Sequence, residues 1–228
     1  MMHCNVWHNI CQSHHVNYHN NSMRANIRIN ELTRVVIVGA GLGGLQLAMH
    51  LRKAGFQVVI VDKNNYNQFP PLIYQVASAG LEPSSISFPL RRIFQGYKNY
   101  FFRMAEVREI DVKEKAIRTS VGTIHYNYLV LAMGATTNFF GNEDVERHAL
   151  PMKTVEDAMA LRNHVLLTLE RAETEENAEK RQKFMNFVIV GGGPSGVEIA
   201  GALAEMKKGI VPKDYPDLPT SLMNIYLI

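Results

Sequence analysis

Cysteine is scarce in this sequence. Its 228 residues include two cysteines, Cys4 and Cys11, and both precede every motif described below. No C-x-x-C or C-x-x-x-x-C pair occurs near the glycine-rich motifs. Thiol–disulfide exchange needs such a pair of neighbouring thiols, so the sequence excludes that chemistry.

Long apolar runs and strong charge are also lacking. The longest apolar-looking segment, residues 187–206, is interrupted by glycines, Pro194 and Glu198, and is therefore not a membrane span. The formal net charge is +3, and no run of Lys or Arg forms a basic patch, which argues against nucleic acid as a partner. A hydrophobic content of 46% and a charged content of 20% are typical of globular proteins.

The first 31 residues differ from the rest of the chain. Five of the nine histidines lie here among many asparagines, without apolar periodicity. Such a polar tract is typical of disorder, so we expect residues 1–31 to be a disordered extension, with Met23 as a candidate true start. Histidine and cysteine are also zinc ligands, but their spacing matches no recognised site and we predict no metal.

A strand–turn–helix pattern organises residues 34–62. A β-branched run typical of a buried parallel strand leads into Gly39, Gly41 and Gly44, which fit G-x-G-x-x-G. These glycines permit a tight turn, the approach of a pyrophosphate and close helix packing. A helix and a second apolar strand follow and end at Asp62, 18 residues after Gly44. The acid that accepts ribose hydroxyls is expected at a spacing of roughly 20, so the stretch predicts an adenine dinucleotide site.

Residues 63–94 predict a long connection, in which Pro89 opens a short helix around residues 91–94. Long loops are often functional, and this one leaves the carboxyl edge of the sheet, where ligands of doubly wound folds lie. Four side chains could either line a flat ring system or form the loop's own packing, and the sequence does not separate these readings: Tyr66, Phe69, Tyr74 and Gln75.

Residues 100–134 predict the remainder of the first domain. A strand at residues 100–104 is followed by three short alternating runs, which indicate a small antiparallel meander over residues 107–126. Residues 128–132 form another buried-strand run that leads to Gly134. A small residue after such a strand is a common second contact for a dinucleotide, although Met133 is bulky for this place.

The opening pattern returns in the last third of the chain. Thr154 and Asp157 form a capping box for a helix expected over residues 155–171, and the charge-rich residues 170–183 predict a solvated linker. A β-branched strand then leads into a second G-x-G-x-x-G, with a first-turn proline, at Gly191, Gly193, Pro194 and Gly196.

The second pattern is incomplete. After its helix come a predicted loop at residues 207–222 and a strand at residues 224–228, where the sequence stops. The acid that would choose between NAD and NADP should follow that strand, and it is absent. We interpret the chain as the product of a truncated reading frame.

These patterns predict an α/β fold with two Rossmann-like domains. The first has a parallel sheet with a small antiparallel β-meander and binds FAD, and the second is the first part of an NAD-binding domain. Two fingerprints suggest one flavin and one nicotinamide nucleotide face to face, with hydride passing from NADH to FAD. The expected boundaries are residues 1–31 for the extension, 32–150 for the first segment of the FAD-binding domain, 151–183 for the helix and linker, and 184–228 for the truncated NAD-binding domain.

From about residue 32 to residue 228 the chain resembles the type II NADH dehydrogenases, which belong to the two-dinucleotide-binding flavoproteins. The resemblance rests on VVIVGAGLGGLQLA, DKNNYNQFPPLIYQVASAGLEPSSISFPLR, NYLVLAMGATTNFFG and VIVGGGPSGVEIAGALAEMKK. The glycine motifs belong to the whole superfamily, whereas YQVASAGLEPSSISFPLR and NFFG are particular to the quinone reductases. The resemblance implies a non-electrogenic, FAD-dependent NADH:quinone oxidoreductase.

The resemblance also implies individual contacts to FAD. The pyrophosphate would be bound by Gly39, Gly41, Leu42, Gly43 and Gly44. Asp62 and Lys63 would lie near the ribose, Val107 would meet the adenine through its backbone, and Gly134 would close over the dinucleotide. Tyr74 and Gln75 would border the isoalloxazine.

For NADH, the resemblance implies phosphate contacts from Gly191, Gly193 and Gly196. Glu198 would lie near the flavin and handle nicotinamide and quinone, which makes it the expected catalytic residue. Its alternative role is that of a first-turn carboxylate favoured by the helix dipole. Two residues depart from the family pattern, since Met133 stands where threonine is usual and Pro70 where glutamine is common.

In the family, the missing C-terminal half completes both domains and supplies quinone-site residues and amphipathic membrane-anchoring helices. The implied partners are therefore ubiquinone or menaquinone, the cytoplasmic membrane face and, at full length, a second copy of the chain. The alternatives are a soluble NAD(P)H-dependent flavoprotein reductase with a protein acceptor such as ferredoxin, or an inactive nucleotide-binding fragment. We expect the isolated chain to be inactive.

Overall fold

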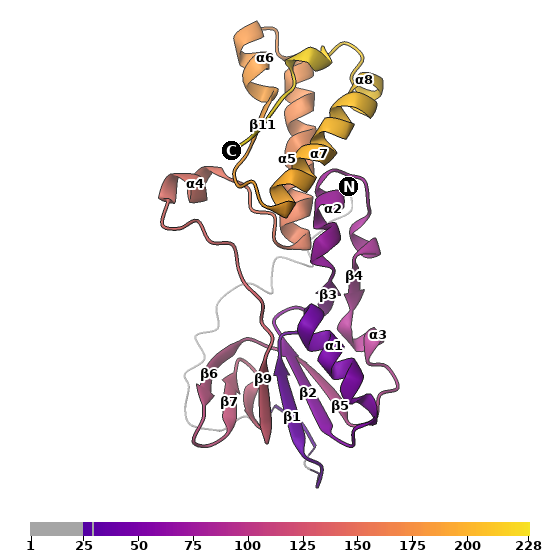
Figure 1. Ribbon diagram of the computed structural model, residues 1–228, viewed down its shortest axis with the longest axis vertical. Coiled ribbons are helices and arrows are strands. Elements are labelled where there is room, and N and C mark those ends of the chain that lie inside the picture. The colour runs from indigo at the N-terminus through magenta and orange to yellow at the C-terminus, as the bar shows by residue number, and fades with distance from the viewer. Residues whose placement is uncertain (1–24, 29) are drawn as a thin grey trace, which may run out of the picture.

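The computed structural model describes residues 25–28 and 30–228. Two units are joined by a narrow β-ribbon (Figure 1). The first unit, in the lower half of Figure 1, is built on a four-stranded sheet, and the second, in the upper half, is mainly helical. The main helices are α1 (Leu42–His50), α5 (Val155–Thr174), α6 (Ala178–Phe184) and α7 (Pro194–Gly209).

The sheet of the first unit is parallel, with strand order β5-β2-β1-β9. Its strands are β1 (Arg34–Val38), β2 (Gln57–Asp62), β5 (Tyr100–Met104) and β9 (Tyr128–Leu131). Side chains alternate along a strand, and in β1 the alternation separates two apolar layers. Val35 and Ile37 pack in one layer, while Val36 and Val38 pack in the other. Because both faces are covered, the strand is apolar from Val35 to Val38.

A helical layer covers one face of this sheet and a β-meander covers the other. The helical layer contains Ala48 of α1 and Leu90 of a short helix, and the meander contributes Ile117 and Ile124. The elements of these layers are η1 (Leu51–Lys53), α3 (Leu90–Ile93), β6 (Val107–Asp111), β7 (Ala116–Thr119) and β8 (Gly122–His125). The meander and the short helix thus lie where the sequence predicts them.

Strand β9 forms an open edge of the first sheet. The sequence predicts a buried strand here, but Tyr128 is 62% and Leu131 is 53% exposed. The prediction of burial is therefore wrong for this strand. Apolar composition indicates a strand, but what covers the strand depends on residues distant in the sequence.

Residues 25–28 pack against the first unit. Ala25 is buried, and its carbonyl accepts a hydrogen bond of 2.6 Å from Arg103 Nε. The carbonyl of Arg28 accepts one of 2.7 Å from Gln57 Nε2. The expected disordered extension is wrong for these residues, because side chains of the first sheet bind their backbone. The remainder of that segment, including the histidine tract and the candidate start, lies outside the described residues apart from residues 30–31.

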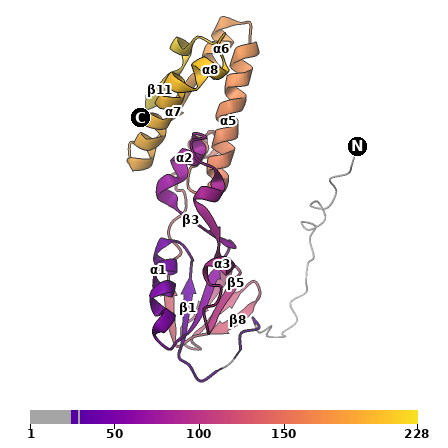
Figure 2. The ribbon, with the colours of Figure 1, turned by 90° about the vertical axis from the view of Figure 1, so that its right-hand side faces the viewer.

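The ribbon between the units consists of β3 (Tyr66–Gln68) and β4 (Ser87–Pro89), which pair antiparallel. Between these strands lie η2 (Pro70–Leu72), α2 (Ile73–Ala77) and η3 (Pro83–Ser85). Figures 1 and 2 show that the ribbon carries α2 up to α5 and α7, and Ile73 and Val76 are buried in the core of the second unit. The predicted long connection is thus a structured bridge.

The second unit has one apolar core beneath a two-stranded parallel sheet. Helices α5 and α7 contribute Val165, Leu169, Ile199 and Leu203 to this core. The sheet is formed by β10 (Asn186–Ile189) and β11 (Asn224–Leu227), and the smaller elements are α4 (Glu143–His148), α8 (Val211–Asp214) and η4 (Thr220–Leu222).

Three local predictions for the second unit can be compared with the structure. The capping box is present, since Thr154 and Asp157 each accept the other's backbone N–H. The expected linker at residues 170–183 instead contains α6, whose first turn is capped by Asn177. The expected loop at residues 207–222 contains α8, and the buried Tyr215 after it donates to Glu170 at 2.8 Å. Tertiary contacts accompany both corrections, since Gln182 of α6 also donates to Leu222 O at 2.9 Å, and such contacts override a polar or irregular local sequence.

Candidate functional site

The first glycine turn lies between β1 and α1 and is tightly packed at two positions. Gly39 has φ +98°, and a Cβ there would meet Ala132 O at 2.3 Å. A Cβ on Gly44 would meet Gly39 O at 1.9 Å. These two glycines therefore let the strand, the helix and the chain after β9 approach one another, as the fingerprint predicts.

The middle of the same turn is open. A Cβ on Gly41 or on Gly43 would meet nothing within 4 Å, and Leu42 is 44% exposed. Gly41 is the N-cap of α1, and no side chain caps this helix. The first N–H groups of a helix have no intrahelical partner and attract anions, so this turn has the shape and the donors that a pyrophosphate needs.

Asp62 lies at the carboxyl end of β2 and reaches back to the first turn. Its Oδ2 accepts the N–H of Ala40 at 2.6 Å, and its Oδ1 accepts the N–H of Asn64 at 2.8 Å. A carboxylate has about four acceptor sites, so these bonds leave capacity for ribose hydroxyls. Lys63 is exposed beside it, and the ribose contacts of both residues stay predictions.

The second glycine turn, between β10 and α7, has the same construction. Gly191 has φ +112°, and a Cβ on Gly196 would meet Gly191 O at 1.9 Å. Gly193 faces open space and is the N-cap of α7, again without a side-chain cap. Pro194 begins the helix, where its missing N–H costs nothing.

The two turns lie on sides of the units that face each other. In Figure 1, β1 runs upward to the turn before α1, and α7 begins at the base of the second unit. Neither turn is filled by a side chain at its open glycine. Both turns can therefore present a bound dinucleotide to the region between the units.

The other predicted FAD contacts lie on the first unit. Gly134 follows β9 with φ +71° and faces open space, and the chain just before it, at Ala132, touches Gly39. Met133 is 63% exposed, so its bulk does not fill the turn. Val107 begins β6 and is half-buried against the apolar layer under the meander. Its contact with adenine stays a prediction.

Glu198 is exposed on α7, four residues after Pro194. The first turn of this helix contains no acidic residue, so Glu198 lies beyond the positions where the helix dipole stabilises a carboxylate most. This placement argues against a role for Glu198 as a first-turn carboxylate favoured by the helix dipole. The exposed side chain is accessible to a ligand bound at the second turn.

The family described as pyridine nucleotide-disulphide oxidoreductase matches residues 33–217, which include both glycine turns. The chain belongs to this family. The predicted Rossmann-like α/β fold class is thereby confirmed. Both cysteines of the sequence precede the first turn, so no thiol pair accompanies either glycine turn in the sequence.

The chain is also similar to several individual proteins. The type II NADH:quinone oxidoreductase NdhA of Mycobacterium tuberculosis is 33% identical over 199 residues, which cover 86% of this chain and 42% of NdhA. The external alternative NAD(P)H-ubiquinone oxidoreductase B4 of Arabidopsis thaliana is 34% identical over 195 residues, which cover 80% of this chain and 33% of that one. The resemblance to type II NADH dehydrogenases is confirmed, and the chain spans less than half the length of these relatives.

The chain is also similar to solved structures of a protein with a related name. NDH2 of Plasmodium falciparum in complex with NADH superimposes with a TM-score of 0.79 at 25% identity, over 86% of this chain and 42% of that one. The same enzyme in complex with RYL-552 gives a TM-score of 0.80 at 26% identity, over 87% and 41%.

Two of the aromatic side chains in residues 63–94, Tyr66 and Tyr74, make contacts within the protein. Tyr74 packs against the core of the second unit and accepts a hydrogen bond of 3.1 Å from Gln75 Nε2. Tyr66 donates to the Glu156 carboxylate, and Phe69 is 41% exposed. These contacts favour the loop's own packing over a ring-lining role for Tyr66 and Tyr74.

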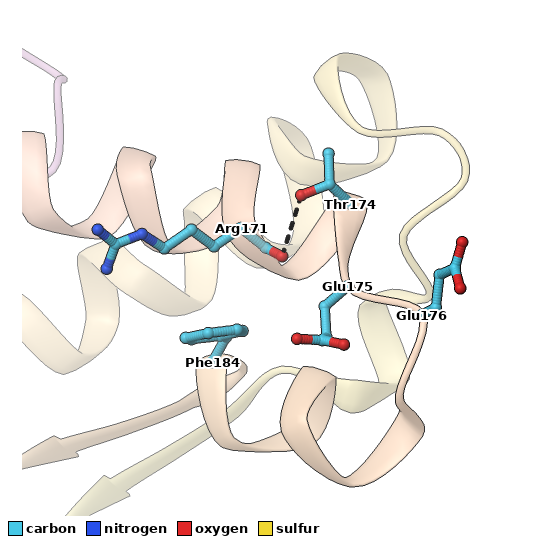
Figure 3. A pocket seen from close by; sticks show the side chains of 5 residues that line it. All are labelled: Arg171, Thr174, Glu175, Glu176 and Phe184. Carbon is cyan, nitrogen blue, oxygen red and sulfur yellow. Dashed lines mark hydrogen bonds between the residues drawn. The ribbon is translucent and has the colours of Figure 1, made fainter.

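A polar pocket lies far from the glycine turns, where α5 meets α6 (Figure 3). It has a volume of about 410 Å³ and is lined by Arg171, Thr174, Glu175, Glu176 and Phe184. Figure 3 shows the Arg171 guanidinium and the Glu176 carboxylate pointing apart. The pocket contains none of the predicted site residues.

Among residues 25–28 and 30–228, no three histidine, cysteine, aspartate or glutamate side chains are grouped to hold a metal ion. Within the same ranges, no helix is long and apolar enough to cross a bilayer.

Two side chains that contact the first glycine turn and the start of α5 are not predicted from the sequence. Asn67 is buried and donates to Ala40 O in the first turn at 2.7 Å. Gln68 accepts the N–H of Val155 at the start of α5 at 3.0 Å. Both sit in a stretch that looks like an irregular polar loop, and no local pattern indicates partners 27 and 87 residues away.

Proposed function

We propose that this protein is a flavoprotein oxidoreductase that passes hydride from NADH to FAD and electrons onward to a quinone. The observation that supports this most is the pair of strand–glycine turn–helix units. The turn before α1 and the turn before α7 lie where the two units face each other (Figure 1). Gly41 and Gly193, the N-caps of these helices, face open space. The relatives named NADH:quinone and NAD(P)H-ubiquinone oxidoreductases favour a quinone as acceptor.

FAD would be held by the first turn. The N–H groups at the start of α1, in Leu42, Gly43 and Gly44, would bind its pyrophosphate, and Gly39 and Gly41 would allow the backbone to come close. Asp62 and Lys63 would orient the ribose, Val107 the adenine, and Gly134 would close over the dinucleotide. When bound, the flavin supplies the hydride acceptance, while the protein supplies position and electrostatics.

NADH would be held by the second turn, through Gly191, Gly193 and Gly196. Glu198, one helical turn further along α7, would interact with the nicotinamide and hold or release a proton when the quinone is reduced. Its exposure leaves it accessible to a ligand. Its role as the catalytic residue is part of this proposal.

We further propose ubiquinone or menaquinone as acceptor, peripheral contact with the cytoplasmic membrane face, and homodimer formation as features of a protein that also has the remaining length of the relatives. The competing function is that of a soluble reductase with a protein acceptor such as ferredoxin. Putidaredoxin reductase shares the fold with a TM-score of 0.60, but at 19% identity it supports the fold alone.

A binding experiment on the purified 228-residue chain tests the cofactor assignment. FAD and NADH are titrated separately and followed by calorimetry. We expect each to bind at one site, and we expect no sustained NADH oxidation, because the chain spans less than half of each relative. Absence of binding by both nucleotides would contradict the cofactor assignment, and rapid turnover would contradict the expected inactivity.

The acceptor is tested in a chimera in which residues 25–228 are continued by the part of NdhA that this chain does not cover. We expect NADH oxidation with ubiquinone or menaquinone analogues and little with ferredoxin. The same chimera with Gly193→Leu, which fills the open position of the second turn, should lose NADH oxidation while keeping its flavin. Activity with ferredoxin but not with quinones would favour the competing function.

A further inference from the structure

Strand β3 has only three residues, yet its two faces contact different units. Successive side chains on a strand point to opposite faces. Asn67 points toward the first glycine turn, whereas Tyr66 and Gln68 point toward the start of α5. Figure 2 shows β3 rising from the first unit to the second.

On one face, Asn67 completes a clamp on a single residue, Ala40, whose carbonyl and N–H are both hydrogen-bonded by side chains. Its Nδ2 donates to Ala40 O at 2.7 Å, while the N–H of Ala40 donates to Asp62 Oδ2 at 2.6 Å. Ala40 is the residue between the first two glycines of the turn. Asn67 is only 7% exposed, and an unpaired amide at such a position would be unfavourable. The orientation of the first turn is therefore fixed from both sides of one residue.

On the other face, Gln68 and Tyr66 bind the first turn of α5. Gln68 Oε1 accepts the N–H of Val155, the first residue of the helix, at 3.0 Å. This N–H has no partner within its own helix. Tyr66 donates to the carboxylate of the next residue, Glu156. Helix α5 packs in the same core as α7, which carries the second glycine turn.

We propose that β3 is a positioning element that sets the spacing and angle between the two glycine turns. Asn67 holds the first turn, and Tyr66 with Gln68 holds the helix packed beside the second. This inference rests on the proposed function in one respect: a fixed spacing matters because the flavin and the nicotinamide must meet. None of these three side chains needs to touch either cofactor.

The spacing is measured by electron spin resonance between two spin labels. One label is placed at Gln46→Cys on α1 and the other at Glu205→Cys on α7, both exposed, with Cys4 and Cys11 changed to Ser. In the Tyr66→Phe/Gln68→Leu variant, we expect the distance distribution to broaden and its maximum to shift. Glu156→Ala, which removes the acceptor of Tyr66 from an exposed position, should give a smaller change of the same kind without disturbing the core.

The clamp on the first turn is measured by amide hydrogen exchange. Loss of one hydrogen bond of about 1 kcal/mol corresponds to about fivefold faster exchange. In Asn67→Leu, we expect this increase for the amides of Gly39 and Ala40, whose N–H groups donate to Val61 O and Asp62 Oδ2. Asn67→His, whose ring can still donate, should restore part of the protection. Asn65→Ala is the matched control, because Asn65 is exposed and only its backbone carbonyl is engaged, by Leu90 N–H.

The two readouts separate this inference from the proposed function. An unchanged distance distribution in both the Tyr66/Gln68 and the Glu156 variants would overturn the proposed role of Tyr66 and Gln68 in holding α5. Unchanged exchange in Asn67→Leu, or an equal change in Asn65→Ala, would overturn the clamp. Both measurements are made without nucleotide, so a chain that fails to bind FAD would contradict the cofactor assignment while leaving these outcomes decisive.

Discussion

Glycines in the first turn serve two different purposes, and single substitutions can distinguish them. Gly44→Ala places a Cβ 1.9 Å from Gly39 O, so we expect a loss of about 1–3 kcal/mol in the free energy of unfolding. Gly41→Ala meets nothing within 4 Å and should fold normally but bind FAD more weakly. Denaturant unfolding measures the free energy of unfolding, and FAD titration measures the affinity for FAD. Gly55 is not a suitable control position, because its φ of +72° would strain any side chain placed there. Equal stability of both variants would contradict the packing role of Gly44.

Glu198 tests the proposed chemistry without a packing effect. Because the side chain is exposed, Glu198→Gln should change the free energy of unfolding by less than about 0.5 kcal/mol. If Glu198 handles a proton, turnover in the NdhA chimera should fall by about 10²-fold, and Glu205→Gln, an exposed carboxylate later on α7, should have no such effect. Stopped-flow measurement of flavin reduction and reoxidation locates the step. Turnover that matches the unmutated chimera would exclude Glu198 as the catalytic residue.

At the scale of single elements, the predictable features are those encoded in neighbouring residues. The apolar runs of β1 and β2, both glycine turns and the Thr154–Asp157 box each lie within one short segment, and all are found as predicted. The features that could not be predicted depend on distant partners. Helix α6 forms in a charge-rich stretch, where Gln182 Nε2 donates to Leu222 O at 2.9 Å, 40 residues away. Strand β9 lies at an edge of the sheet and leaves Tyr128 and Leu131 exposed.

Tyr215 connects α8 to α5, and its ionisation should reveal that contact. Burial, the hydrogen bond to Glu170 and the nearby negative charge of Asp214 raise the pKa of Tyr215 from 10.0 to about 12. A pKa raised in the folded state stabilises the fold below pH 10 and loses that contribution as the pH rises from 10 through about 12. The difference in unfolding free energy between wild type and Tyr215→Phe should therefore shrink across this window. A difference that stays the same across this pH range would contradict the prediction.

At the scale of the whole molecule, the two nucleotide-binding units are not independent. The sequence suggests two domains with boundaries at residues 150 and 183, because each fingerprint forms a local unit. The core of the second unit, however, contains α2, which lies between β3 and β4 of the ribbon. Helix α5, expected to belong with a linker, packs in that same core. This core is formed by segments that are distant in the sequence. Patterns within short segments therefore predict two separate domains, although the packing joins them.

Because α2 packs in the core of the second unit, we expect a core substitution in α2 to destabilise that unit. Ile73 is 3% exposed, so Ile73→Ala should lower the free energy of unfolding by about 2–5 kcal/mol. The faster hydrogen exchange should appear in α5 and α7 rather than in β1 and β2. Leu167→Ala on α5 removes similar apolar volume at a site that is 50% exposed and should cost far less. If exchange in Ile73→Ala increased only within the first unit, α2 would be a local appendage and the two units would fold separately.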